Sequence, residues 1–277
     1  MYLEDLDPNA SLTDHLTRLL TRNVMLDDAG ALLRDQLSEP RNYATLVENI
    51  ASGFTRLSDI ARMSGMEDGA ASKYLGVLKK LGVVERAVPA TVTRPAQSKL
   101  GRYRIVDPYL RFYYRFIWPN RTLIASGRLD VPLATLQQHL HEFVGKHSFE
   151  ELCREWVLDY AGSGQLGFVP RRIGSFWRSR SGETSGMEID VMAINEDEHE
   201  MLIGECKFTR EAIGASVVRK LIEDKTPLVD IDMSKKWTIR YAFFSRSGFS
   251  SDARTAAKRF DCEFVDLTRL ERDLRKS

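Results

Sequence analysis

The chain has 277 residues, of which 43% are hydrophobic and 29% are charged, and its mean hydropathy is -0.30. This balance indicates about two globular domains and excludes a wholly disordered or collagen-like chain. It also excludes a membrane protein, because no apolar run approaches the roughly 18 residues that a spanning helix needs. The acidic N-terminus lacks the pattern of a secretory signal, and the scattered Cys153, Cys206 and Cys262 fit neither a disulfide framework nor a zinc site. We therefore expect a cytoplasmic protein with reduced thiols.

The net charge of +1 is unevenly distributed along the chain. Residues 1–40 hold three basic and eight acidic residues, residues 41–130 hold fifteen and seven, and residues 131–277 hold twenty-two and twenty-four. The middle segment therefore carries a charge of +8 between two acidic flanks. This asymmetry favours a nucleic-acid surface, although a solvated arginine-rich face would have the same composition.

Residues 1–40 predict two short helices. In the first, Ser11 stands at a cap position before leucines that recur at helical spacing. The second contains Leu32, Leu33 and Leu37 and ends before Pro40, because the residue before a proline disfavours the helical conformation. Two helices this short cannot bury a core alone, so we expect them to pack on something else.

Residues 41–128 predict a winged helix-turn-helix domain. Three helices are expected over residues 43–50, 57–63 and 70–81, each followed by a glycine-containing turn. Two strands, starting at residues 83 and 102, are separated by a polar, proline-bearing segment. Three helices followed by a β-hairpin are the pattern of this fold. The residues of the third helix expected in the core are Tyr74, Leu75, Leu78 and Leu81.

Basic residues follow the third helix and the hairpin of this domain. The candidate DNA-contacting residues are Lys73, Lys79, Lys80, Arg94, Lys99 and Arg102, with Ser72 and Arg104 beside them. Cations on these two elements can contact phosphates while the helix lies in a major groove. The alternative is a protein–protein module with a solvated basic face, because no cluster of base-reading Arg or Asn stands on the helix.

The most aromatic stretch of the chain, residues 107–119, follows the hairpin. Leu110, Tyr113, Tyr114 and Ile117 recur there at helical spacing. This spacing favours a helix packed within the domain over a platform on which bases stack.

Residues 129–277 predict an α/β domain with a mixed central sheet. A helix over residues 147–158 precedes three strands, which are expected over residues 172–177, 188–194 and 201–208. The remaining elements are a helix around 215–223, a strand over 238–244, a helix over 251–260 and a strand over 262–267. The order is therefore αβββαβαβ.

Four charged residues on two of these strands carry the candidate chemistry. Side chains two apart share a face of a strand, so Glu188 joins Asp190, and Glu205 joins Lys207. An antiparallel hairpin centred in the polar loop 195–200 places Asp190 opposite Glu205 and Glu188 opposite Lys207. The four groups then converge on one patch of one sheet face.

The strands that carry these charges are apolar on both faces. Ile189, Val191 and Ala193 are expected on one face, and Met192 continues the face of Asp190. Strands of this kind are buried in the centre of a sheet. A carboxylate set into such a strand costs several kcal/mol unless something pairs with it.

A divalent cation held by Asp190 and Glu205 would supply this pairing, and a carboxylate pair with waters suits Mg²⁺ or Mn²⁺. Lys207 could then orient a water or stabilise charge that develops on a phosphorane-like transition state. Glu188 is a supporting residue. The alternatives are a structural ion cluster and a solvated, charge-bearing strand face.

At these residues the sequence resembles the PD-(D/E)XK nuclease superfamily. Asp190 stands in the first acidic position, Glu205-Cys-Lys207 forms the E-x-K, and Gly186-Met-Glu-Ile-Asp190 is similar to the G-x-E-I-D of Mrr-type and Holliday-junction-resolvase-like members. The resemblance implies a restriction-endonuclease-like αβββαβ fold, a Mg²⁺ cofactor and a further glutamate from the first helix, which is Glu150 here, with Glu151 as the reserve. The chain departs from the family in lacking the proline motif and a glutamine on the following helix.

A second resemblance covers nearly the whole chain. Pro40-Arg-Asn-Tyr43, the winged helix, Gly101–Phe112 and the nuclease-like domain resemble the C-terminal two thirds of archaeal-type, DEXX-box-like P-loop ATPases. Residues 1–40 then correspond to the trailing helices of an ATPase domain. The chain contains no G-x-x-x-x-G-K-[ST], so we expect no ATP binding on it.

Two functions follow from these patterns. The first is a Mg²⁺-dependent DNA endonuclease steered by a winged helix. The second is a catalytically silent DNA-binding or assembly module, whose nuclease fold serves as a scaffold or regulatory partner of an ATPase. The expected partners are DNA and a P-loop ATPase domain or subunit, with no membrane, and a homo-oligomer is left open.

Overall fold

The structure is a computed structural model that describes residues 10–21, 39–178, 186–232 and 234–275. The chain divides into two compact units. The first comprises Met1–Ala87 and Gly101–Leu140, and the second comprises Val88–Leu100 and His141–Ser277. The predicted helix that contains Leu32, Leu33 and Leu37 lies outside the described residues.

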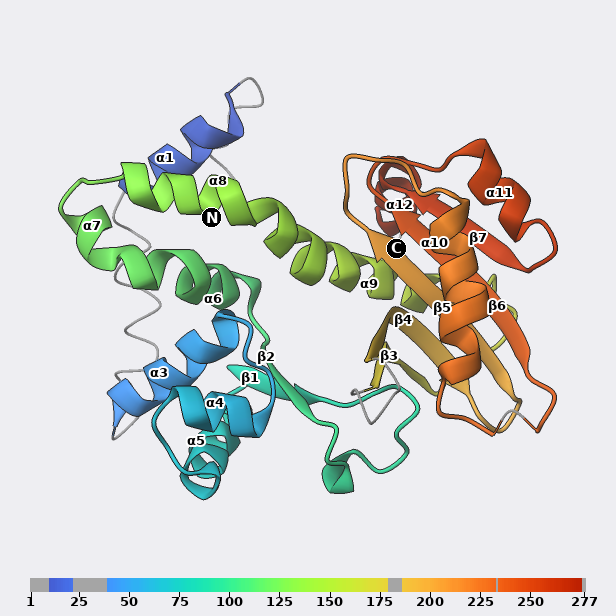
Figure 1. Ribbon diagram of the computed structural model, residues 1–277, viewed down its shortest axis with the longest axis horizontal. Coiled ribbons are helices and arrows are strands. Elements are labelled where there is room, and N and C mark those ends of the chain that lie inside the picture. The colour runs from blue at the N-terminus through green and yellow to red at the C-terminus, as the bar shows by residue number, and fades with distance from the viewer. Residues whose placement is uncertain (1–9, 22–38, 179–185, 233, 276–277) are drawn as a thin grey trace. The chain divides into compact units, whose positions relative to one another are not determined.

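The described part of the first unit is helical apart from one β-hairpin (Figure 1). Its elements are α1 (Leu12–Thr21), α3 (Pro40–Ala51), α4 (Leu57–Met63), α5 (Asp68–Lys80), β1 (Val84–Ala87), β2 (Arg102–Ile105), α6 (Pro108–Phe112), the π-helical η2 (Tyr113–Ile117), η3 (Trp118–Asn120), α7 (Arg121–Ala125) and most of α8 (Asp130–Phe143). The hairpin strands are antiparallel, and Val84 pairs with Ile105.

Helices α3, α4 and α5 bury the apolar stripes that the sequence predicts. Leu46 and Val47 of α3, Ile60 of α4, and Leu75 and Leu78 of α5 are fully buried. Since these residues recur every three or four positions, one face of each helix is removed from water. Burial of side chains of this size contributes about 1.5–3 kcal/mol each.

The expected burial of Leu81 is wrong, because its side chain is 42% exposed. Helix α5 ends at Lys80, so Leu81 is the C-cap residue and no longer lies on the helix stripe. Gly82 follows with a φ of +72°, a conformation that glycine adopts without steric cost and that ends the helix.

The aromatic stretch packs inside the first unit. Tyr113, Tyr114, Phe116 and Ile117 are each about 1% exposed. The prediction of a packing helix is therefore confirmed, and the alternative of a base-stacking platform at these residues is wrong.

The second unit holds a five-stranded sheet among its described residues. Its elements are η1 (Pro95–Gln97), the π-helical η4 (Val144–Phe149), α9 (Glu150–Gly162), β3 (Arg172–Arg178), β4 (Met187–Asn195), β5 (Glu200–Lys207), α10 (Ala215–Arg219), the π-helical η5 (Lys220–Lys225), η6 (Thr226–Leu228), β6 (Thr238–Ser245), α11 (Ser251–Ala257), β7 (Cys262–Asp266) and α12 (Leu267–Leu274). The strand order is β3-β4-β5-β6-β7.

This sheet is mixed, as predicted. The pairs β3–β4 and β4–β5 are antiparallel, whereas β5–β6 and β6–β7 are parallel. The parallel pairs require crossovers, which α10 with η5 and then α11 provide. Mixed α/β is therefore the fold class of this unit.

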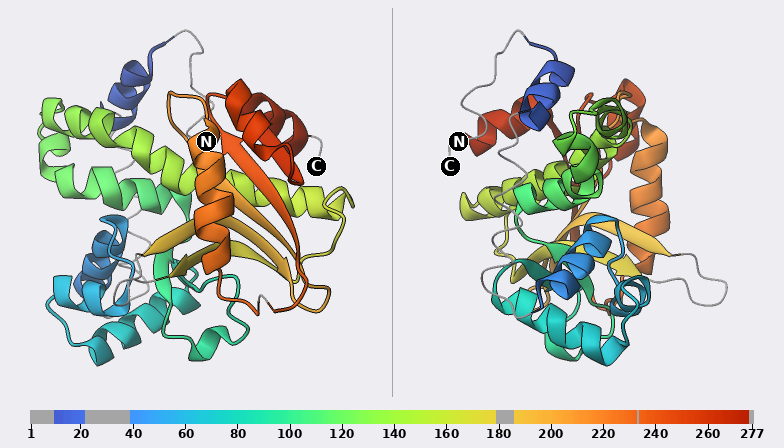
Figure 2. Two further views of the ribbon diagram at one scale, coloured as in Figure 1. Left: turned by 45° about the vertical axis from the view of Figure 1, so that its right-hand side comes forward. Right: turned by 90° about the vertical axis from the view of Figure 1, so that its left-hand side faces the viewer.

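Helices cover both faces of the sheet, which explains why β4 and β5 are apolar on both sides (Figure 2). On one face, Val218 and Leu221 from α10 and η5 pack with Ala253 from α11. On the other face, Trp156 from α9 packs with Leu270 from α12. The central strands are consequently shielded from water, and any charge they carry is expensive to leave unpaired.

Two further features concern the length of the helices and the state of the cysteines. In the part of the chain that the structure describes, no helix is both long and apolar enough to cross a membrane. Cys153, Cys206 and Cys262 are free thiols.

Candidate functional site

Strands β4 and β5 form the hairpin that carries the candidate residues. Their antiparallel ladder pairs Asn195 with Glu200 and ends with Val191 opposite Gly204. These pairs are symmetric about the polar loop 195–200, as the sequence predicts. Beyond the last backbone pair, a side chain replaces the backbone as hydrogen-bond acceptor. Oδ2 of Asp190 accepts a hydrogen bond of 2.8 Å from the backbone N–H of Cys206.

A β-bulge in β4 determines where Asp190 lies. Gly174 of β3 pairs with Met192 and Phe176 pairs with Ile189, so two residues of β4 stand opposite one residue of β3. The expected sharing of one face by Ile189 and Val191 is therefore wrong: Ile189 packs in the core layer of α10, and Val191 packs in that of α9. A bulge re-aims a side chain locally, and here it does so at the candidate acid.

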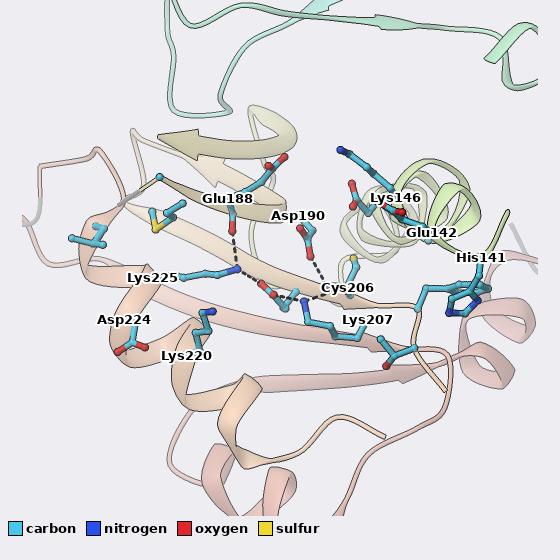
Figure 3. Close-up of a pocket in the computed structure, with 18 residues that line it drawn as sticks. His141, Glu142, Lys146, Glu188, Asp190, Cys206, Lys207, Lys220, Asp224 and Lys225 are labelled. Carbon is cyan, nitrogen blue, oxygen red and sulfur yellow. Dashed lines mark hydrogen bonds and ion pairs between the residues drawn. The ribbon is translucent and has the colours of Figure 1, made fainter. Parts of the chain in front are cut away.

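The candidate residues lie around one cavity of about 990 Å³ in the second unit (Figure 3). We call it the carboxylate cavity. Glu150, Asp190, Glu205 and Lys207 all line it, as does Glu188, whereas the reserve residue Glu151 does not. The other lining residues are His141, Glu142, Gly145, Lys146, Gly186, Met187, Cys206, Phe208, Thr209, Lys220, Asp224, Lys225 and Leu228.

Glu205 lies between two lysines. Its Oε1 is 2.6 Å from Nζ of Lys207, and its Oε2 is 2.6 Å from Nζ of Lys225. The two ammonium groups point toward each other in Figure 3. Lys225 also donates to the backbone oxygen of Glu188 at 2.7 Å. Because Glu205 is only 5% exposed, these two lysines provide the charge pairing that its burial requires.

Lys225 is a site residue that the sequence analysis missed. It stands at the end of η5, where the predicted helix over residues 215–223 was expected to have finished. The crossover helix continues with π-helical turns, and these bring Lys225 back over β5. The only available signal was the cluster of lysines at 220 and 225 after a buried strand, which is not specific.

Glu150 enters the site from the first turn of α9. Burial raises its pKa to about 8, and the neighbouring Asp190 adds to the rise. Arg154, one turn later, opposes this rise in pKa, and its Nη1 lies 3.7 Å from Oε2 of Glu150. The same Nη1 donates to the backbone oxygen of Asp190 at 3.0 Å. A carboxyl group with this pKa is protonated at neutral pH when no cation is bound.

The pKa of Asp190 is also raised. Burial raises its pKa to about 6, and the charge of Glu205 adds to the effect, while the hydrogen bond from Cys206 opposes it. Burial therefore disfavours the charged forms of Glu150 and Asp190, and a bound cation would offset that cost.

The donor set fits a hard divalent cation, although the side chains are not arranged as a finished metal site. Among the described residues, no three His, Cys, Asp or Glu side chains are placed to hold one ion. Both oxygens of Glu205 are engaged by lysines, so one lysine must move before Glu205 can act as a ligand. Asp190, with Glu150 beside it, offers the oxygen ligands that Mg²⁺ and Mn²⁺ prefer.

We expect the metal-free protein to lose stability as pH rises. The folded protein holds the Glu150 proton more tightly than the unfolded chain does, so this contribution is complete below pH 4.5 and is lost as pH rises through about 8. In EDTA, the melting temperature should fall across this window, and Glu150→Gln should flatten the fall. Thermal melts between pH 5 and 8 measure both slopes; parallel curves for the two proteins would contradict the assignment.

The predicted DNA-contacting residues are divided between the two units. Lys73, Lys79 and Lys80 are exposed on α5 of the first unit, with Arg102 at the start of β2. Arg94 and Lys99 are exposed in the segment Val88–Leu100, which belongs to the second unit.

That segment is fixed to the sheet at several points. Ala90 N donates to the oxygen of Ser175 at 2.9 Å, and Trp177 Nε1 donates to the oxygen of Leu100 at 3.0 Å. The expected wing is therefore a docked strap on edge strand β3. Arg104 of β2 forms an ion pair with Glu85 of β1.

Together, the fold and the site define a mixed α/β protein with a cavity lined by carboxylates and lysines. Comparison with known proteins identifies similarity to archaeal sequences without adding an activity. The model of a family described as archaeal and bacterial proteins of unknown function (DUF234) matches residues 113–220. An uncharacterised protein of Methanocaldococcus jannaschii is 29% identical over 209 residues, which are 74% of this chain and 45% of that protein. The chain thus spans less than half the length of this relative. No solved structure shows a significant match.

Proposed function

We propose that this protein is a Mg²⁺-dependent DNA endonuclease of the PD-(D/E)XK type. The observation that carries the proposal is the convergence of Glu150, Asp190, Glu205 and Lys207 on one cavity. The raised pKa values of Glu150 and Asp190 support it, because they indicate a site built to receive a cation. The sequence motif and the order of helices and strands along the chain, αβββαβαβ, also support it.

Each residue has a distinct role in this proposal. Asp190, aimed by the bulge in β4, and Glu205 hold the cation, and Glu150 completes the ligand field from α9. A bound Mg²⁺ would polarise the phosphate and neutralise negative charge in the transition state. Lys207, which lies 34% exposed at the end of β5, orients the attacking water or stabilises the phosphate. Lys225 holds the carboxylate of Glu205 in place.

The DNA is held mainly by a winged helix-turn-helix in the first unit. The three helices α3, α4 and α5 and the hairpin β1–β2 support this assignment, as does the charge of +8 over residues 41–130. Phosphate contacts from Lys73, Lys79 and Lys80 position the duplex without reading its sequence. DNA as the partner and the cytoplasm as the location remain part of the proposal.

Affinity for duplex DNA should fall steeply as salt increases. Each neutralised phosphate contributes about 0.9 to the slope of log K against log salt. Lys73→Ala, Lys79→Ala and Arg102→Ala should each weaken binding and reduce this slope by about one, while leaving sequence preference unchanged. Fluorescence anisotropy at several salt concentrations measures the slopes, with Lys258→Ala, at the C-cap of α11, as the control. Salt-independent binding, or a triple variant that binds like the wild type, would assign the basic face to a protein partner.

One observation favours a second function, a catalytically silent DNA-binding or assembly module of an archaeal-type ATPase. The pairing of both Glu205 oxygens with lysines can neutralise the site without a metal. In that case the cavity is a structural ion cluster. An ATPase partner, suggested by the resemblance at Pro40–Tyr43 and Gly101–Phe112, would then supply the activity.

Metal binding separates the two functions. Isothermal titration of Mg²⁺ and Mn²⁺ into the wild-type protein should show binding that Asp190→Asn abolishes, together with nicking of plasmid or branched DNA by the wild type. No cleavage of single-stranded, duplex or branched DNA, combined with equal metal binding by both proteins, would establish the silent module.

A further inference from the structure

Three flat side chains form a cluster at one side of the carboxylate cavity. The rings of His141 and Phe208 lie 5.0 Å apart between centroids, at an interplanar angle of 35°. The guanidinium carbon of Arg246 lies 5.0 Å from the centroid of Phe208. We call these residues the flat cluster. His141 and Phe208 both line the cavity that holds Asp190 and Lys207, and His141 is drawn beyond Lys207 in Figure 3.

Phe208 is fixed in place from the protein side. It directly follows Lys207, and its ring lies 5.2 Å from that of Phe149. A Cβ atom at Gly145 would come within 3.0 Å of the Phe208 Cβ, so a larger residue at 145 would press on it. The backbone N–H of Arg246 donates to the oxygen of Lys207 at 3.0 Å. The flat cluster is therefore rigidly connected to the strand that carries the E-x-K residues.

The outer members of the cluster face solvent and are joined to each other. His141 and Arg246 are both exposed. Their closest nitrogen atoms, Nδ1 of His141 and Nη1 of Arg246, lie 3.0 Å apart. A guanidinium group only donates, so Nδ1 must accept and the proton of a neutral His141 lies on Nε2. The imidazole and the guanidinium are thus flat, polarizable groups, and both belong to exposed residues.

We propose that the flat cluster binds an unpaired nucleobase by stacking, next to the phosphate that is cleaved. Aromatic rings and arginine planes are the groups on which single-stranded nucleic acids stack their bases. In a duplex the base faces are covered by their neighbours, so only a single-stranded, frayed or flipped nucleotide can use such a platform. This inference rests on the proposed nuclease function and specifies its substrate: DNA with single-stranded character at the cleavage point.

Arg246 could instead bind a phosphate as a simple cation, and the test separates these roles. A lysine keeps the charge but loses the planar group that stacks. Arg254 provides a matched control, because it also lies over aromatic rings, 4.9 Å from the Phe264 centroid and 5.6 Å from that of Phe249. Unlike Phe208, the ring under Arg246, these two rings do not line the carboxylate cavity.

The experiment uses the full chain in EDTA, so that binding is measured without cleavage. The probe is a single-stranded pentathymidylate with 2-aminopurine at its centre, a base whose fluorescence is quenched on stacking. We expect the wild type to quench it, and His141→Ala and Arg246→Ala to bind about 10-fold more weakly with loss of the quench. Arg246→Lys should lose the quench as well, and Arg254→Ala should behave like the wild type. Melting curves check that each variant folds.

Three results would overturn the inference: no quench by the wild type, wild-type quench by Arg246→Lys, or unchanged binding by His141→Ala. The second of these would identify a phosphate contact. This test does not depend on catalysis. If the protein quenches the probe but cleaves no DNA, the base site is supported and the nuclease proposal is contradicted. If the protein cleaves DNA but does not quench the probe, the nuclease proposal is supported and the base site is contradicted.

Discussion

In Mg²⁺ buffer, Asp190→Asn is expected to lower the rate of DNA cleavage by about 10³-fold while the protein remains folded. Asparagine removes the charge that holds the cation but keeps an oxygen that can accept the hydrogen bond from the Cys206 N–H, now 2.8 Å long. Alanine would leave that buried N–H without its partner, at a cost of about 1–3 kcal/mol. The isosteric change therefore separates a loss of chemistry from a loss of structure.

The matched control for this variant lies on the same hairpin. Asp197→Asn changes an exposed carboxylate that pairs with Arg171 at the hairpin tip, outside the carboxylate cavity. Cleavage should be unaffected by it, and Glu150→Gln should give an intermediate loss. In metal-free buffer, Asp190→Asn should melt at the wild-type temperature or above, because burial already penalises the charge of Asp190. Wild-type cleavage rates in Asp190→Asn would contradict the assignment of this residue to the metal.

The register of the β4–β5 hairpin was predictable because it depends on local information. A polar loop between two apolar runs fixes the centre of a hairpin, and pairing on either side then follows by symmetry. The observed pairs from Asn195–Glu200 to Val191–Gly204 have that symmetry. The mixed sheet followed in the same way from the order and spacing of the apolar runs.

The position of Asp190 could not be derived from β4 and β5 alone. It depends on the bulge against β3, a strand that precedes Asp190 by more than ten residues. A sequence of alternating apolar and polar residues does not show whether the strand contains a bulge, that is, one extra residue relative to its neighbour. Only the packing of Ile189 and Val191 in opposite core layers reveals the shift.

Lys225 and the strap over residues 88–100 were missed for a related reason. Lys225 reaches Glu205 because π-helical turns follow α10, and no sequence pattern distinguishes those turns from ordinary helix. The strap is polar and contains proline, which predicts an exposed wing. Its docking depends on backbone hydrogen bonds such as that from Ala90 N–H to the oxygen of Ser175. Because every residue has these backbone groups, the sequence does not indicate where they pair.

The two lysines on Glu205 are expected to differ in their effect. Lys207→Ala should reduce cleavage by about 100-fold but retain Mg²⁺ binding, since a lysine is not a metal ligand and its removal frees Oε1 of Glu205. Lys225→Met should act mainly on stability. Lys225 is 15% exposed and Glu205 is 7% exposed at the side chain. Breaking a buried pair costs up to about 3 kcal/mol, and here Oε2 of Glu205 loses its cation while Lys207 still pairs with Oε1.

A cation should compensate for the loss of Lys225, and this is the sharper result. In EDTA, Lys225→Met should unfold at a clearly lower denaturant concentration than the wild type. Added Mg²⁺ should raise its midpoint more than it raises that of the wild type, because the ion and the lysine neutralise the same carboxylate. Lys220→Met, an exposed neighbour that lines the same cavity, is the control. If Mg²⁺ stabilises Lys225→Met no more than it stabilises Lys220→Met, then the cation does not reach Glu205, and the two lysines are the permanent partners of a structural ion cluster.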